Sequence, residues 1–214
     1  MKAFDIVQNE KLISSASKLD FEKIIPVKTI EEALAYKSRG FVLASERDGK
    51  KIDGMDMGNS PQHFYSTALK GKIIVLSTTN GTDAILAALA GDTVLIGSFL
   101  NLTAISKKLI ESQKDIILLC AGWKNKFNLE DTIFAGAIIS KIKHSLNCTS
   151  SDASMAAEYL YNQSKNDLSG FLHTSSHYNR LKHLNLEDDM KFSLKIDLTD
   201  KVPVFDGKEI RAMG

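Results

Sequence analysis

Short apolar runs alternate along the chain with segments in which apolar residues recur at helical spacing. The runs are rich in valine, isoleucine and leucine without polar alternation, which is typical of strands covered by helices on both faces. They predict strands over Lys23–Val27, Phe41–Ser45, Lys72–Ser77, Thr93–Ser98 and Asp115–Cys120. The helical spacing predicts helices over Ile30–Ser38, Pro61–Leu69, Thr82–Leu89, Leu102–Ser112, Leu129–His144 and Ala153–Asn162. The alternation predicts an α/β fold, a three-layer α/β/α sandwich with a largely parallel or mixed central sheet.

The pattern changes after residue 145, where serine, asparagine and aspartate become frequent. From there the chain predicts helices, then a polar strand over Met190–Asp197 and a short tail that contains a turn. A segment with so few apolar runs is expected to pack on the main sheet rather than to fold alone. We therefore predict a single α/β domain over 1–214, with 146–214 as a C-terminal extension on the same sheet.

Composition excludes several classes of protein. The chain has 214 residues and is 43% hydrophobic, enough to bury one substantial core. Its 27 basic and 26 acidic side chains leave a formal charge of +1, so there is no broad basic field for nucleic acid or an anionic membrane. No apolar stretch is long enough to span a bilayer. The two cysteines form no disulfide framework, which favours a reducing compartment and a cytoplasmic location.

Polar, chemically distinctive loops follow the predicted strands. Ligands of open parallel sheets gather beyond the carboxyl ends of the strands, so these loops hold the candidate site residues. They contain Glu46, Asp56, Asn59 and Ser60 in the first loop, Ser77–Thr82 in the second, Ser98 and Asn101 in the third, and Cys120, Gly122, Glu130 and Asp131 in the fourth.

The second of these loops, STTNGT, has two interpretations. Gly81 permits backbone twists, the hydroxyls of Thr78, Thr79 and Thr82 can donate, and a helix follows, so the loop can cradle a phosphate or carboxylate. Alternatively, Asn80-Gly81 forms a tight turn and Thr82 caps the helix. The loop matches neither a Walker A sequence nor a dinucleotide-binding fingerprint.

Acidic side chains suggest a hard-cation site. Glu130 and Asp131 are consecutive at a predicted helix start, and Glu46 and Asp56 lie in another loop; oxygen ligands of this kind suit Mg²⁺. Each acidic pair can instead be solvated charge that favours the helix dipole. His173 and His177, spaced by four, lack the further ligands that a zinc site requires, so capping or surface roles are favoured.

Taken together, the loops resemble a known family. GMDMGNSP, STTNGT, GSFLN and LLCAGWKNKFNLEDTIFAGAII, with His177, Arg180 and Leu181 followed by EDDMKFSLKID and VPVFDGKEI, resemble the signature segments of the 2-phosphosulfolactate phosphatase family. The likeness covers most of the chain, from about Ile24 to Ile210. It implies a Mg²⁺-dependent phosphatase acting on a small phosphorylated or sulfonated acid.

The N-terminal segment departs from that family. Laid without gaps against the family's VVIDVLRATTTI-like segment, FDIVQNEKLISSA matches the family's Asp with Asp5 but places Gln8 where an arginine is expected. In the alternative alignment MKAFDIV is the family's first strand and the whole segment is absent. Both alignments remove the arginine, and a glutamine cannot offer a charged, bidentate fork to an anion.

The resemblance and the loops together imply a magnesium-dependent phosphomonoester hydrolase. Hydrolysis by metal-bound water and hydrolysis through an aspartyl-phosphate are both open. The alternative is a catalytically degenerate member that binds a small anionic metabolite. A short first strand would leave a sheet edge exposed, which a homodimer could cover. The predicted site residues are Asp5, Glu130 and Asp131 for catalysis; Asn59, Ser60, Thr78, Thr79, Asn80, Gly81, Thr82, Asn101, Cys120 and Gly122 for substrate; and Asp5, Glu46, Asp56 and Asp131 for metal.

Overall fold

The computed structural model describes residues 3–8, 21–47, 50–58, 60–61, 64, 69–78, 80–124, 126–146 and 150–213, with the backbone alone at 3–8, 50 and 213. The strands are β1 (Ala3–Gln8), β2 (Lys23–Pro26), β3 (Val42–Arg47), β4 (Lys50–Lys51), β5 (Ile73–Ser77), β6 (Thr93–Gly97), β7 (Asp115–Cys120), β8 (Val202–Phe205) and β9 (Ile210–Met213). The α-helices are α2 (Ile30–Leu34), α3 (Gly81–Ala87), α4 (Leu102–Ser112), α5 (Leu129–Leu146), α6 (Asp152–Ser164), α7 (Leu168–Leu172), α8 (Ser176–His183) and α9 (Glu187–Ser193). Short 3₁₀ turns are η1 (Lys37–Arg39), η4 (Ala88–Ala90) and η5 (Phe99–Asn101).

These strands form a mixed sheet in the order β4-β3-β5-β2-β9-β8-β6-β1-β7. The strands β3, β5 and β2 are parallel to one another, and so are β6, β1 and β7. The antiparallel hairpin β8–β9 joins the two groups. The first strand therefore lies inside the sheet, between β6 and β7, and β7 forms the edge beside it. The homodimer stays a prediction.

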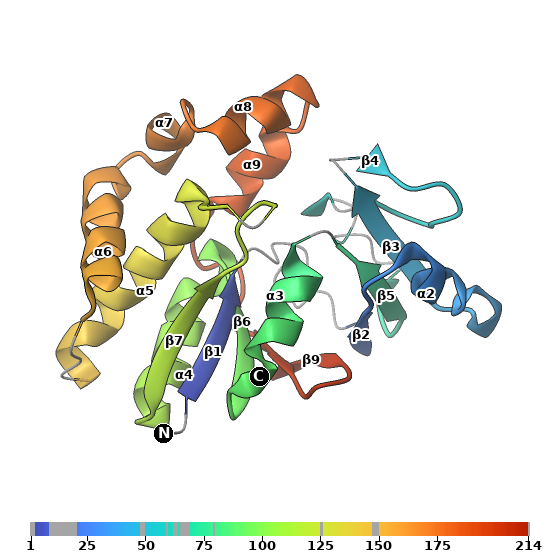
Figure 1. Ribbon diagram of the computed structural model, residues 1–214, viewed down its shortest axis with the longest axis horizontal. Coiled ribbons are helices and arrows are strands. Elements are labelled where there is room, and N and C mark those ends of the chain that lie inside the picture. Colours follow the sequence, from blue (N-terminus) through green and yellow to red (C-terminus); the bar gives the residue numbers. More distant parts are fainter. Residues whose placement is uncertain are drawn as a thin grey trace.

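Helices cover both faces of this sheet. Figure 1 shows α3 on the near side of β1 and β6, with α4 on the far side. Neighbouring residues of β6 accordingly point into different clusters: Val94 and Ile96 pack with Ile85 of α3, whereas Leu95 packs with Ile105 of α4. The predicted three-layer α/β/α sandwich is confirmed, with a mixed sheet at its centre.

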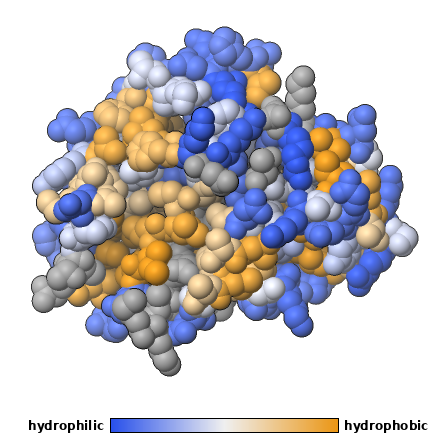
Figure 2. Space-filling view, viewed as in Figure 1, coloured by the Kyte–Doolittle hydropathy of each residue, from blue (hydrophilic) through white to orange (hydrophobic). Residues whose placement is uncertain are grey.

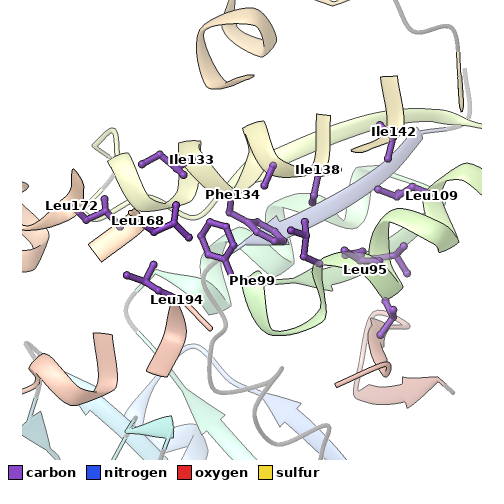
Figure 3. Close-up of a cluster of buried hydrophobic side chains, with 14 of the residues drawn as sticks. Leu95, Phe99, Leu109, Ile133, Phe134, Ile138, Ile142, Leu168, Leu172 and Leu194 are labelled. Carbon is purple, nitrogen blue, oxygen red and sulfur yellow. The ribbon is translucent and has the colours of Figure 1, made fainter. Parts of the chain in front are cut away.

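The core on the far side is centred on α5. Phe134 of α5 is fully buried and meets Phe99 edge to face, with ring centroids 5.2 Å apart. Leu168, Leu172 and Leu194 close the same cluster from the C-terminal region, as Figure 3 shows. These contacts hold α5, and so the acidic residues at its start, against the sheet and the last third of the chain.

The edge strand β7 has an incompletely covered face. Figure 2 shows hydrophobic side chains gathered over β7 and α3, while the region of α8 at the top is mainly hydrophilic. Ile117 of β7 is 49% exposed and Leu89 beyond α3 is 45% exposed. Among the helices within the described segments, none has the length and apolar character needed to cross a membrane.

The five strands predicted from apolar runs are confirmed as β2, β3, β5, β6 and β7. The strand predicted over Met190–Asp197 is wrong, because Met190–Ser193 completes the helix α9. Met190 and Leu194, four residues apart, both join the core, whereas the strand pattern would also bury Ile196, which is 45% exposed. The tail forms the hairpin β8–β9. Most of the helix predicted over Pro61–Leu69 lies outside the described residues.

Candidate functional site

The loop after β7 folds back on the start of α5. Gly122 adopts a left-handed backbone conformation with φ of 70°, and a side chain there would have its Cβ 2.7 Å from the carbonyl oxygen of Lys126. Trp123 and Lys126 exchange backbone hydrogen bonds, which closes the turn. The Gly122 amide donates to Oδ2 of Asp131 at 2.7 Å. Glycine is therefore required at 122, and its amide fixes the position of one carboxylate.

Two consecutive acidic residues are buried where α5 begins. Glu130 is 4% exposed and Asp131 is 1% exposed. The amides of both residues lie within hydrogen-bond range of Oδ1 of Asn128, at 2.9 Å and 3.4 Å, which caps the helix. Negative charge at a helix N-terminus is favoured by the helix dipole, but burying two carboxylates together is costly unless a cation or donors compensate. The pair is thus suited to hold positive charge.

Helix α8 brings a histidine and an arginine to this place. His177 Nδ1 lies 3.3 Å from Glu130 Oε2, within ion-pair range. Arg180, one helical turn further along, stacks on Trp123, with its Cζ 4.9 Å from the ring centroid. The Lys124 ammonium is 5.0 Å from the same centroid. Figure 1 shows the loop after β7 between the start of α5 and helices α8 and α9. Carboxylates and cations therefore meet at one end of the molecule.

The predicted loops after β5 and β7 do meet. Asn80, before α3, accepts a hydrogen bond through Oδ1 from the Lys124 amide at 3.0 Å. Ser60, from the first polar loop, donates through Oγ to Asp189 of α9 at 2.8 Å. Asn80 is thereby placed beside the candidate site, and Ser60 is tied to the C-terminal helices that cover it.

Thr78 and Thr82 bond each other at the start of α3. Thr82 lies inside the helix, whose cap residue is Asn80, so the expected cap by Thr82 is not formed. The Thr82 amide donates to Thr78 Oγ1 at 3.1 Å, and the two hydroxyl oxygens are 3.3 Å apart. Both side chains are buried. Gly81 is the first residue of α3 and is not among the residues with positive φ, so the special backbone freedom expected of it is not used. That these three residues bind an anion stays a prediction.

The side chain of Asn101 is held by three backbone groups, and its predicted contact with substrate stays a prediction. Its Oδ1 accepts from the Ser98 amide at 2.9 Å, and its Nδ2 donates to the carbonyls of Ile96 and Lys201, each at 3.2 Å. The side chain is fully buried. Since both ends of the amide are engaged, Asn101 fastens β6 to the segment that leads into β8.

The predicted metal set is not assembled as a group. Asp56 accepts a hydrogen bond through Oδ2 from the Leu43 amide at 2.8 Å, near the beginning of β3. Glu46 lies within β3, opposite Lys51 of β4. Among the described residues, no three histidine, cysteine, aspartate or glutamate side chains group as metal ligands. Glu46 and Asp56 therefore do not form a ligand group with Asp131. The acidic pair Glu130–Asp131 is the remaining candidate for binding a cation.

Three other predicted residues are described only in their backbone or lie outside the described residues. The backbone of Asp5 pairs with Val94 and Ile117, three residues before the end of β1, and its side chain is not described. Asn59 and Thr79 are outside the described residues. Gln8 ends β1 and pairs with Cys120.

Cys120 ends β7 beside the acidic pair. Burial, and secondarily the negative charge of Asp131, raise the pKa of its thiol to about 12. The neutral thiol is a poor nucleophile, because the thiolate is the reactive form. Cys120 can therefore line the site, but it is not poised for covalent catalysis.

We expect Cys120 to react slowly with iodoacetamide at pH 8. In a Cys148→Ser background, alkylation of the folded protein should be at least about a hundredfold slower than in the denatured chain, because so little thiolate is present. Mass spectrometry of timed samples measures both rates. Similar rates in the folded and denatured states would contradict the raised pKa.

His177 and Arg180 were missed as site residues by reasoning from spacing. His173 caps the end of α7, whereas His177 belongs to α8, so the pair does not share one helix face. The signal that pointed to α8 was the resemblance of the His177-to-Leu181 segment to a family tail. Nothing in the local pattern indicates that His177 contacts Glu130.

Comparison with known proteins gives a consistent result. The family model described as 2-phosphosulpholactate phosphatase matches residues 3–208. A protein of Caldanaerobacter subterraneus named probable 2-phosphosulfolactate phosphatase is 35% identical, covering 93% of this chain and 84% of its own. Proteins with the same name from Clostridium novyi and Thermotoga maritima are 34% and 38% identical; the alignments cover 94% and 93% of this chain, and 86% of each relative.

Proposed function

The chain belongs to the 2-phosphosulfolactate phosphatase family, and on that premise we propose that it is a magnesium-dependent phosphatase acting on a small phosphorylated hydroxy acid. The substrate resembles 2-phosphosulfolactate. The observation that carries the proposal is the buried pair Glu130–Asp131, held at the start of α5 with Asp131 tied to the Gly122 amide. Hydrolysis joins a water oxygen to phosphorus, breaks the ester P–O bond and returns a proton to the leaving alkoxide.

Magnesium fits this pair of residues. Mg²⁺ is commonly bound by one or two carboxylates, with waters and substrate phosphate oxygens completing its coordination. Two buried carboxylates without a third protein ligand among the described residues match such an open site better than a closed structural one. Glu130 and Asp131 would hold the ion, which supplies charge neutralisation at the phosphoryl group.

The chain's own residues have separate tasks in this proposal. Asp131 is fixed by a backbone donor, so its carboxylate is preorganised rather than ordered on binding. His177, beside Glu130, can hold a proton next to the reacting group. Asn80 keeps the loop after β7 beside the start of α3.

Phosphate release from 2-phosphosulfolactate, 2-phospholactate and p-nitrophenyl phosphate tests the proposal, with Mg²⁺ and with excess chelator. We expect turnover of the phosphorylated hydroxy acids that chelator reduces at least about a hundredfold and added Mg²⁺ restores. Folded protein that binds Mg²⁺ and sulfolactate but releases no phosphate would instead support the degenerate binding protein, which the neutral Gln8 at the end of β1 favours.

A further inference from the structure

Part of the Arg180 guanidinium has no acceptor among the residues that the structure describes. Arg180 is half-buried and stacks on Trp123, yet its Nε is buried with no hydrogen-bond partner among the residues that the structure describes. Arginine is always charged, and a buried donor without an acceptor is costly. Stacking occupies one face of the planar group and leaves its N–H edge for an acceptor. The arrangement is what an anion-binding arginine requires.

Arg180 lies on the same side of α8 as the histidine that contacts the acidic pair. His177 and Arg180 are three residues apart on α8 and so lie on the same helix face. His177 is at Glu130, and the backbone of Arg180 lies about one turn, roughly 5 Å in axial rise, further along α8. Trp123, on which Arg180 stacks, directly follows Gly122, whose amide bonds Asp131, so the guanidinium and the acidic pair belong to one region.

The charge around Trp123 supports this location. Lys124 and Arg180 both lie about 5 Å from the ring centroid, so two cations meet at one indole. At the end of β1, Gln8 is neutral where the resemblance leads one to expect an arginine. A cation for the substrate must then come from another element, and α8 provides one.

We propose that Arg180 binds the second acid group of the substrate, a sulfonate or carboxylate, and that Trp123 positions it. The guanidinium donates two parallel N–H bonds to two oxygens of that group, which also selects against phosphate esters without it. This assignment rests on the proposed function for the identity of the substrate. The ability of Arg180 to bind an acid does not depend on the proposed function.

The single tryptophan allows binding at Arg180 to be observed directly. Trp123 is the only tryptophan in the chain, so intrinsic fluorescence reports on the ring under Arg180. We expect sulfolactate with Mg²⁺ to change this fluorescence saturably. Lactate keeps the carboxylate and lacks the sulfonate, so it should bind at least about tenfold more weakly if Arg180 holds the sulfonate, and about equally well if Arg180 holds the carboxylate. Arg180→Gln should weaken sulfolactate binding between about tenfold and a hundredfold, and Arg180→Lys by less.

Arg39→Gln is the matched control. Arg39 also stacks on aromatic rings, 5.2 Å from the Tyr36 centroid and 4.8 Å from that of Phe41, but it lies in η1 between α2 and β3. This variant removes an equivalent charge and should leave sulfolactate binding unchanged. Thermal melts test whether each variant is folded. If Arg180→Gln does not fold, Arg180→Lys still tests the role of the arginine.

Steady-state kinetics separate the two ideas. For the sulfonated substrate, Arg180→Gln should raise KM at least about tenfold with kcat within about threefold, while isopropyl phosphate, which lacks the acid group, is hydrolysed as before. Turnover with an unchanged KM in Arg180→Gln overturns the role of Arg180 and leaves the proposed function intact. If the wild type shows no turnover but its fluorescence response needs Arg180, the result supports the proposed role of Arg180 and rejects the phosphatase activity. A fluorescence response that is absent from the wild type, or that is equally large in Arg180→Gln, overturns the proposed role of Arg180.

Discussion

Replacing Asp131 with asparagine should lower kcat/KM for the phosphorylated hydroxy acid between about a hundredfold and a thousandfold. Asparagine is nearly the same size and keeps an oxygen that accepts the Gly122 amide, so the turn after β7 should survive. What is lost is the negative charge of a side chain that is 1% exposed. Phosphate-release kinetics at saturating Mg²⁺ measure the effect.

Asp167→Asn is the control for this substitution. Asp167 also accepts an amide at a helix start, from Gly170 at 2.8 Å, but it belongs to the exposed beginning of α7. Its replacement should leave turnover within about twofold, because only a surface cap changes. Asp131→Asn protein with a tenth or more of wild-type activity would contradict the proposed role of the acidic pair.

Cys120 provides a second measurement on the same variant. Part of the increase in its thiol pKa comes from the charge of Asp131, so Asp131→Asn should lower that pKa and speed alkylation. Burial is the larger cause, and the thiol should therefore remain slower than in the denatured chain. A loss of activity without faster alkylation would mean that Asp131 is not charged in the folded protein.

The sequence predicted five strands correctly because long apolar runs leave a strong signal, whereas the short strands β4, β8 and β9 were not predicted. The apolar runs of β5 and β6 predict strands with both faces covered, as in the middle of a layered fold. The segment after Met190 shows the limit of such patterns. Apolar residues there alternate as in a strand, yet Ser193 is buried and Ile196 is exposed because the helix α9 packs against the core.

The candidate site was predictable only in its local parts. The neighbourhood of Gly122, Glu130 and Asp131 follows from one continuous segment of chain. His177 reaches Glu130 from α8, and that contact depends on how the C-terminal helices pack, which no spacing rule encodes. The structural role of Asn101 was not predictable either, since a buried amide that bonds three backbone groups looks in sequence like a polar loop residue.

Gly136→Ala should destabilise the protein by about 2 kcal/mol or more, lowering Tm by roughly 4–8 °C. Gly136 is buried in α5 where α6 crosses it, and a Cβ there would lie 2.0 Å from the carbonyl oxygen of Ala157. That atom belongs to helix backbone and cannot turn aside as a side chain can. The overlap should outweigh the roughly 1 kcal/mol that alanine gains over glycine inside a helix.

The same substitution should leave the active site nearly intact, because the two helices are not equally held. Helix α5 is fixed by Phe134 against Phe99 and by its contacts with β7 and α4, whereas α6 packs mainly on α5. The outer helix should therefore move, and turnover at 25 °C should stay within about threefold while Tm falls. Gly58→Ala, whose Cβ would have its nearest neighbour at 3.5 Å, should change neither quantity. An unchanged Tm in Gly136→Ala would mean that the contact between α5 and α6 is looser than the geometry indicates. A large loss of turnover below Tm would mean that α5 itself moves and carries Glu130 and Asp131 with it.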